Sequence, residues 1–206
     1  MKKENCLILN GERFEISDDL VKNLKSALEK DGRSPLAEKE IGSIAKIGEF
    51  EFIVLDHKGG NTRLILKDLY VKSMAFGSNN NDYRESNVIK VCREFAEKIE
   101  KLVGAENLLL HTVDLTSDDG LRDYGVNSER ASLLTTDLYR AYVDVLDKYK
   151  LDAWWWLVTP HSTKRHDNDE WVKCVSPRGY VLNGSCGFSN FGVRPFLILK
   201  SDILVS

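Results

Sequence analysis

The chain of 206 residues has few cysteines, and they form no paired motif. Cys6, Cys92, Cys174 and Cys186 are scattered, and none stands at the C-x-x-C spacing of zinc sites and thioredoxin-like redox sites. The sequence therefore excludes a zinc-ribbon or dithiol-exchange protein. We expect reduced thiols in a cytoplasm, each acting as a small buried hydrophobic residue.

Long apolar runs are missing as well. The first residues, MKKENCLILNGERF, hold an apolar stretch of only about four residues and no small-residue cleavage site. No run approaches the roughly 20 apolar residues that a membrane-spanning helix needs. We expect a protein without a membrane segment in the cytoplasm of a bacterial host, with a virion as the alternative location.

The chain also lacks a strong charge of either sign. It has 29 basic and 32 acidic residues, a net charge of −3, and no block of Lys and Arg. Binding to nucleic acid depends largely on neutralising phosphates with clustered cations. The composition thus argues against a nucleic-acid partner and leaves the oligomeric state open.

What is present, a hydrophobic fraction of 42%, is enough to build a core. Residues 6–16 predict a strand or hairpin that turns at Asn10-Gly11, and Ser17 is a typical N-cap for the helix that follows. Asp31-Gly32 ends that helix, and RSPLAEKE (33–40) is a polar connector. We predict a small strand–helix appendage and linker over residues 1–43.

From Ile44 the pattern changes to that of a larger domain, over residues 44–206. Two apolar runs, 49–56 and 62–71, are joined through Gly59-Gly60 and predict a β-hairpin. Apolar residues at helical spacing predict a helix at about 86–103, and Thr136 can cap a second helix over 137–149. Short strands punctuated by glycine follow. This order indicates an α+β fold with two main helices.

Several motifs in this domain resemble a bacterial and phage domain family of unknown function. WWWLVTP (154–160), VKCVSPRGYVLNG (172–184) and GVRPFLIL (192–199) follow the family's W-W-L-R-S-P, glycine-turn strand and G-V-R-P-A-L in order. Upstream, IGEFEFIVLD (47–56) with RLILKD (63–68), and YRESNVIKV (83–91), look like its opening hairpin and its helix start.

That family is similar to the C-type-lectin-like and sulfatase-modifying-factor fold group. The resemblance implies a compact α+β domain with irregular β-structure and long loops, encoded by a phage or mobile element. Two residue pairs depart from the pattern. Val158-Thr159 replaces the usual Arg-Ser, so no role of that arginine carries over, and Val88-Ile89 stands where an Ile-Arg pair is usual.

The tryptophan run raises the question of a binding platform against a core strand. In a strand, Trp154 and Trp156 point to one side and Trp155 to the other, and three exposed tryptophans would cost solubility. Because the resemblance places this strand at the centre of the domain, we interpret all three as core. We interpret Arg194, in GVRP, as an arginine that ties strand ends together.

No catalytic or cofactor constellation is recognisable. Cys174 and Cys186 are twelve residues apart and do not reproduce the close cysteine pair of the oxidase branch of the fold group. The calcium triplets of lectins are missing, and DNDE (167–170) is more typical of a polar loop than of a metal site. His161 and His166 lie in that loop without a catalytic motif. We predict no enzyme activity, no metal and no cofactor.

Three long polar loops, 77–83, 115–127 and 161–171, are the candidate binding surface. They lead us to predict a non-catalytic module that recognises another macromolecule, most simply a protein. One alternative is a small soluble inhibitor of a bacterial defence complex, similar in role to anti-CRISPR proteins. A more distant alternative is an oxidase-like enzyme. The predicted contact residues are Tyr83, Tyr124, Arg165 and Trp171.

Overall fold

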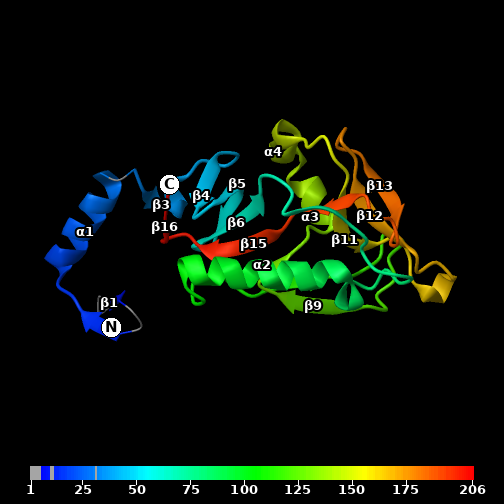
Figure 1. Cartoon of the computed structure of the whole chain (residues 1–206), viewed down its shortest axis with the longest axis horizontal. Helices are drawn as coiled ribbons and strands as arrows, with labels where there is room; N and C mark the ends of the chain where they lie inside the picture. The colour runs from blue at the N-terminus through cyan, green and yellow to red at the C-terminus, as the bar shows by residue number, and fades with distance from the viewer. Residues whose placement is uncertain (1–5, 10–11, 31) are drawn as a thin grey trace.

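The computed structural model describes residues 6–9, 12–30 and 32–206 of the chain. They form a mixed α+β structure in which a small N-terminal unit precedes a body built on two curled five-stranded sheets. In Figure 1 the N-terminal unit lies at one end of the long axis, apart from the body.

The N-terminal unit contains a hairpin and a helix, as predicted. Strands β1 (Cys6–Leu9) and β2 (Glu12–Glu15) pair antiparallel, and α1 (Asp18–Lys30) follows. The hydroxyl of Ser17 accepts a hydrogen bond from the backbone N–H of Leu20 at 3.2 Å, which is the expected N-cap contact. The predicted turn at Asn10-Gly11 and the helix end at Asp31 lie outside the described residues.

The predicted polar linker is shorter in the structure than in our interpretation of the sequence. β3 (Ser34–Pro35) pairs with β16 (Leu204–Val205), and η1 (Leu36–Glu38) follows. Leu36 is fully buried, and its N–H donates to the carbonyl of Ile203 at 2.8 Å. One apolar side chain therefore anchors the segment, and from Ser34 onward the chain belongs to the body.

The first sheet has the strand order β10-β15-β6-β5-β4 and is antiparallel throughout. The predicted hairpin is its centre, and Gly59 and Gly60 adopt positive φ of 61° and 76° at the turn. Its strands are β4 (Ile44–Ile47), β5 (Phe50–Lys58), β6 (Asn61–Leu66), β10 (Ala131–Ser132) and β15 (Phe196–Lys200).

The second sheet has the order β13-β12-β11-β14-β7, with β11 and β14 parallel and the other pairs antiparallel. A separate two-stranded ladder joins β8 (His111–Asp114) to β9 (Val126–Glu129). The strands of the second sheet are β7 (Val71–Met74), β11 (Trp155–Pro160), β12 (Trp171–Val175), β13 (Val181–Ser185) and β14 (Phe191–Val193).

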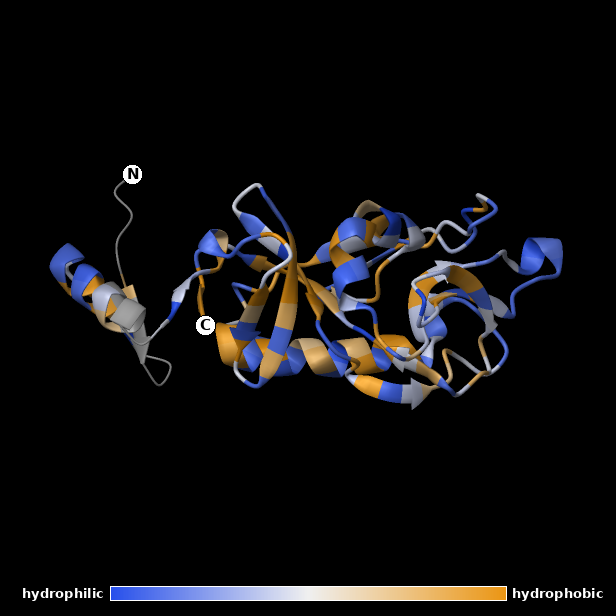
Figure 2. Cartoon of the chain, turned by 90° about the horizontal axis from the view of Figure 1, so that it is seen from above, coloured by the Kyte–Doolittle hydropathy of each residue, from blue (hydrophilic) through white to orange (hydrophobic). Residues whose placement is uncertain are grey.

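The main helix, α2 (Asn87–Val103), agrees with the prediction. It is capped by the hydroxyl of Ser86, which accepts from the N–H of Ile89 at 3.1 Å, and it ends at Gly104 with φ of 87°. Hydrophilic and hydrophobic residues alternate along this helix in Figure 2, and its apolar residues, which include Val88, Phe95 and Ile99, are buried.

The second predicted helix is broken into α3 (Thr136–Ala141), α4 (Val143–Leu146) and η3 (Asp147–Tyr149). The N-cap is Thr135 instead of Thr136. The break falls at Tyr142, whose backbone leaves helical geometry (φ −110°, ψ 14°) and whose hydroxyl donates to Asp56 of β5 at 2.6 Å. This tertiary contact overrides the helical pattern.

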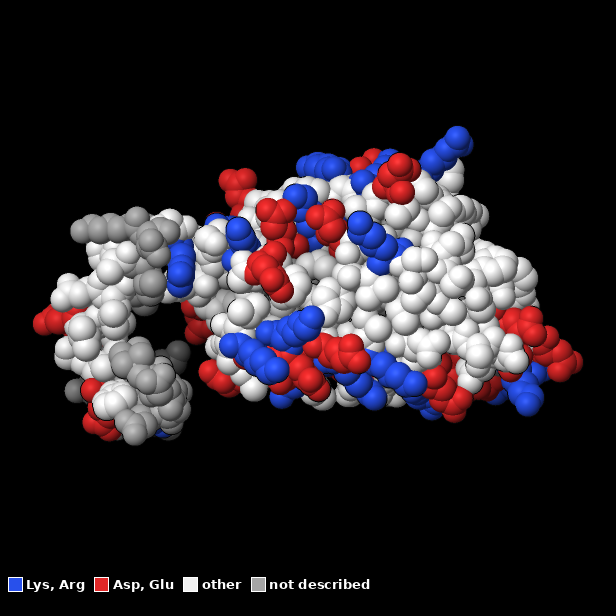
Figure 3. All heavy atoms as spheres, viewed as in Figure 1, with Lys and Arg blue, Asp and Glu red and all other residues white. Residues whose placement is uncertain are grey.

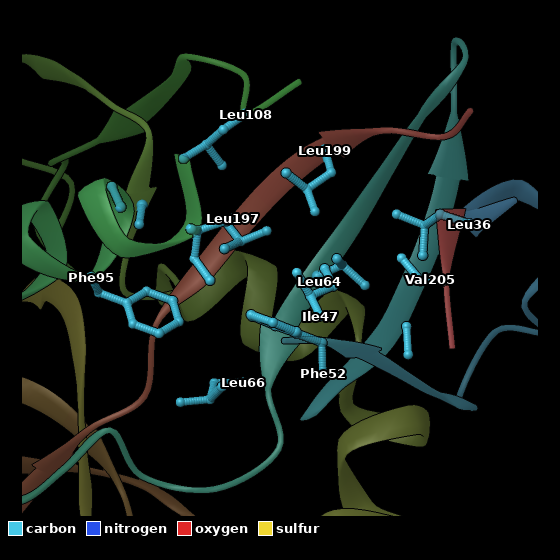
Figure 4. Close-up of a cluster of buried hydrophobic side chains, with 14 of the residues drawn as sticks. Leu36, Ile47, Phe52, Leu64, Leu66, Phe95, Leu108, Leu197, Leu199 and Val205 are labelled. Atoms are coloured by element: carbon cyan, nitrogen blue, oxygen red, sulfur yellow. The ribbon is translucent and has the colours of Figure 1, made fainter. Parts of the chain in front are cut away.

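Three hydrophobic clusters fill the body. The first lies between α2 and one face of the first sheet, where Phe95 meets Phe52 and Leu197 (Figure 4). The second lies between α2 and one face of the second sheet, and it includes Cys92 and Cys174. The third lies between the two sheets and also includes side chains of α3 and α4. Helix α2 therefore contributes to two clusters and joins the sheets.

The tryptophan run lies at the division between two clusters. Trp156 is fully buried in the second cluster and donates its indole N–H to the carbonyl of Met74 at 3.0 Å. Trp155 points to the opposite face and lies in the third cluster, while Trp154 is partly buried and stacks on Phe191 at 5.4 Å. The run is structural in position, with alternate side chains serving opposite faces of one strand.

Candidate functional site

The three loops singled out in the sequence, residues 77–83, 115–127 and 161–171, meet at the end of the body that is far from the N-terminal unit (Figure 1). We call this surface the three-loop cluster. The segment that carries η4 (Lys164–His166) projects furthest and is strongly hydrophilic in Figure 2.

One buried side chain ties all three loops together. Asn81 is fully buried, and its amide nitrogen donates to the carbonyls of Ser162 at 3.0 Å and Trp171 at 2.9 Å. Its amide oxygen accepts from the hydroxyl of Tyr124 at 2.7 Å. A buried amide with both ends bonded fixes the relative position of segments up to 90 residues apart in the chain.

Asp119 makes a second set of contacts between two of the loops. Its carboxylate accepts from the hydroxyl of Ser162 at 2.6 Å, from Nδ1 of His166 at 3.0 Å and from the hydroxyl of Ser117. Desolvation raises the pKa of this carboxyl, but the hydrogen bonds from Ser117, Ser162 and His166 outweigh it and lower the pKa well below its usual value. Asp119 is therefore an ionised acceptor at neutral pH.

Asp123 also contacts the loop of residues 161–171. It accepts from the hydroxyl of Thr163 at 2.6 Å and forms an ion pair with Arg165. The backbone adds a further link, since the N–H of Asp118 donates to the carbonyl of Pro160 at 2.9 Å. Hydrogen bonds and an ion pair thus link residues 115–127 to residues 160–171.

The outer surface of the cluster carries cations and aromatic groups. Arg84, which directly follows the first loop, has a side chain that is 46% exposed. Within the cluster the side chain of Arg165 is 61% exposed, and Trp171 is 39% exposed. The guanidinium of Arg84 lies over the ring of Tyr124 at 5.7 Å from its centroid. Figure 3 shows red and blue spheres side by side at this end of the molecule. The cluster therefore presents mixed charge around an aromatic group.

The four predicted contact residues have different environments. Arg165 and Trp171 present exposed side chains, and Tyr124 is partly buried, with burial raising the pKa of its hydroxyl to about 12. Tyr83 is 1% exposed, and its ring lies 6.3 Å from that of Phe76 in the second cluster. Its side chain is thus part of the core, which corrects its assignment as a surface contact.

Ser162, His166 and Asp119 have the composition of a catalytic triad but not the geometry. A triad uses the two ring nitrogens of histidine for different partners, one for the carboxylate and one for the nucleophile. Here Nδ1 of His166 faces both Asp119 at 3.0 Å and the hydroxyl of Ser162 at 3.4 Å, while that hydroxyl donates to Asp119. Ser162 is also only 3% exposed. The three groups hold a loop and do not form a nucleophile.

Cys174 and Cys186 lie in surroundings that disfavour thiol reactivity. Cys174 and Cys186 are both buried free thiols in the second cluster, and desolvation raises both pKa values, that of Cys174 to about 12. A thiolate, the reactive form, is disfavoured at neutral pH in such surroundings. Cys6 differs from our expectation of four buried cysteines, because it is exposed.

Arg194 lies between β14 and β15 and binds backbone carbonyls at the end of β6. It is 1% exposed, and it donates to the carbonyls of Leu66 at 2.8 Å and Lys67 at 2.7 Å. Its guanidinium also lies 5.3 Å from the ring centre of Trp155. Desolvation lowers its pKa to about 10, so it remains charged at neutral pH and satisfies its charge through the backbone.

The sequence contains no signal for the residues that hold the cluster together. Asn81, Asp119 and Asp123 are polar residues in polar loops, and their partners stand 40 to 90 positions away. Loop length and polarity identify the three loops from the sequence. The hydrogen bonds between them cannot be predicted in this way, because they depend on how the folded sheets place the loops next to one another.

Comparison with known proteins finds no matching family model, no similar curated protein and no similar solved structure. Across residues 6–9, 12–30 and 32–206, no group of three or more His, Cys, Asp or Glu residues is placed to hold a metal ion. In the same part of the chain, no helix combines the length and the apolar character needed to cross a membrane.

Proposed function

We propose that the protein is a non-catalytic recognition module that binds another protein through the three-loop cluster. The observation that carries the proposal is the buried amide of Asn81, which joins all three loops. Loops that are already ordered lose little conformational entropy when a partner binds, so more of the contact energy remains as affinity.

The side chains at the surface of the cluster support a protein partner. Arginine and tryptophan are enriched at the energetically important positions of protein interfaces, and here Arg84, Arg165 and Trp171 are all partly exposed. Asp167 and Glu170 stand exposed beside them. This mixture of charges fits a protein surface better than a row of phosphates.

We also propose a C-type-lectin-like architecture and a phage or mobile-element origin for the body. The support is the order of the motifs in residues 44–206, together with two curled sheets whose connections form long loops at one end. The motif resemblance supports the proposed origin, and the three loops support the proposed binding function.

The test is capture of a partner from host lysate by the purified chain, followed by binding measurements on the identified protein. Trp171→Ala and Arg165→Ala should each weaken binding by roughly tenfold or more, which is the usual effect of truncating a central contact. Lys101→Ala and Leu110→Ala are matched controls, since both residues are exposed and lie outside the cluster.

Thermal melting of each variant separates a binding defect from a folding defect. A partner that the two cluster variants bind as tightly as the wild-type chain does, and that a control variant releases, would place the binding surface elsewhere.

A further inference from the structure

Strand β13 is the edge strand of the second sheet, and among the residues that the structure describes it pairs with β12 alone. The register runs from Val181 opposite Val175 to Ser185 opposite Trp171. Two backbone hydrogen bonds show which residue pairs of this ladder are the directly bonded ones. The N–H of Ser176 donates to the carbonyl of Tyr180 at 2.9 Å, and the N–H of Cys186 donates to the carbonyl of Glu170 at 2.7 Å.

Because bonded and non-bonded pairs alternate in an antiparallel ladder, the even-numbered residues of β13 direct their backbone groups toward β12. The N–H and C=O groups of Val181, Asn183 and Ser185 then point away from the sheet. Within the described residues, only the carbonyl of Ser185 among these groups has a bond, from the N–H of Phe188 at 2.9 Å. β13 therefore presents an open edge.

This edge lacks the features that usually prevent strands from associating. Natural sheet edges are protected by charged residues, proline or a covering segment. Residues 179–193 contain no charged residue and no proline, in a chain of which 30% is charged. Figure 3 shows the corresponding surface free of blue and red spheres. Tyr180, Leu182 and Phe188 are exposed there, at 61%, 44% and 49%.

The residues of β13 are complementary to themselves about its central position. In an antiparallel pair of two β13 strands centred on Asn183, Leu182 of each copy stands opposite Gly184 of the other, and Val181 stands opposite Ser185. Each pair joins a large residue to a small one. Gly184 must be small, because a Cβ there would lie 2.2 Å from the ring of Phe191.

We propose that β13 pairs antiparallel with β13 of a second copy of this chain, with a two-fold axis at Asn183. The outward groups of Val181, Asn183 and Ser185 then form up to about six hydrogen bonds, because each directly bonded pair exchanges two. Each Leu182 becomes covered beside the partner's Gly184. The interface is distinct from the three-loop cluster, and it extends the second sheet across two protomers.

A short edge buries little area, so the association is weak and concentration-dependent. Sedimentation velocity from about 10 µM to about 500 µM should show a reversible monomer–dimer equilibrium. A chain that stays monomeric over this range would overturn the proposal.

Asn183→Pro removes the N–H at the axis, while the fold of the monomer keeps its bonds because that N–H does not face β12. The dissociation constant should rise by about tenfold or more. Asn183→Thr is the matched control: it keeps the N–H and should dimerise like the wild-type chain. An unchanged dissociation constant in a folded Asn183→Pro chain would overturn the proposal.

Hydrogen exchange of the wild-type chain tests the same edge without any substitution. The amides of Val181, Asn183 and Ser185 should exchange more slowly at high protein concentration, whereas those of Leu182 and Gly184 should not change. If the three outward amides exchange at the same rate at both concentrations, or are protected only when a different protein is added, the self-association is refuted.

Discussion

Replacing Asn81 by alanine should loosen the three-loop cluster by about 3 kcal/mol. The substitution removes three hydrogen bonds from a fully buried side chain, and each bond contributes about 1 kcal/mol net. The carbonyl of Trp171 retains a bond from the N–H of His161 at 2.8 Å. The loss of this side chain therefore leaves the Trp171 carbonyl bonded, whereas the carbonyl of Ser162 and the hydroxyl of Tyr124 lose the partner that Asn81 provides.

The assay combines urea unfolding with hydrogen exchange at the N–H groups of Asp118 and His161, both bonded within the cluster. Exchange reports local opening even if the rest of the body stays folded. Asn79→Ala is the matched control, because Asn79 is an exposed asparagine of the same loop and should change stability by no more than about 0.5 kcal/mol.

A second substitution tests the direction of the hydrogen bonds. Asn81→Asp keeps the shape but aims a carboxylate at two carbonyl oxygens. It should destabilise the cluster at least as much as alanine at neutral pH, and less as the new carboxyl becomes protonated. If Asn81→Ala costs less than about 1 kcal/mol by both measurements, the cluster is not held by this side chain and our reasoning fails.

Three further predictions concern the body. Trp156→Ala should cost about 3–5 kcal/mol in urea unfolding because the indole is fully buried, while Trp171→Ala, at an exposed site, should cost little; equal losses would contradict the placement of the run. Burial lowers the pKa of His111 from 6.5 to about 4, so the contribution of the neutral imidazole to the free energy of unfolding is fully present above pH 6.5 and is lost as the pH falls toward 4, by up to about 3 kcal/mol. His111→Gln should reduce the dependence of the free energy of unfolding on pH between 4 and 6.5. An unchanged slope would exclude His111 as the cause. Trypsin should cut within residues 30–33 and spare Lys39 in the native chain, because the body begins at Ser34; early cleavage after Lys39 would contradict that boundary.

Local sequence signals predicted the elements that local physics determines. The helix over 86–103 has a serine cap, a regular apolar stripe and a terminal glycine, and the hairpin has two apolar runs around Gly59-Gly60; all of these act within a few residues. The alternation of the tryptophan run likewise follows from strand geometry alone.

Long-range contacts account for what the sequence did not reveal. The second helix breaks because Tyr142 reaches Asp56, a partner 86 positions away. The connector after α1 becomes part of the body because of Leu36, the one large apolar residue in the segment RSPLAEKE. Tyr83 has the appearance of a loop contact residue but points inward to Phe76. Within the candidate site, the loops were predictable, but the central role of Asn81 was not.

The pairing of β3 with β16 brings Ser34 next to Val205. A body whose first and last strands are neighbours can be entered and left at one place on its surface. It could be inserted as a unit into a loop of another protein through two short linkers, without opening any of its three clusters. By the same geometry, joining these two strands and cutting the chain at the Gly59-Gly60 turn should give a circular permutant that still folds.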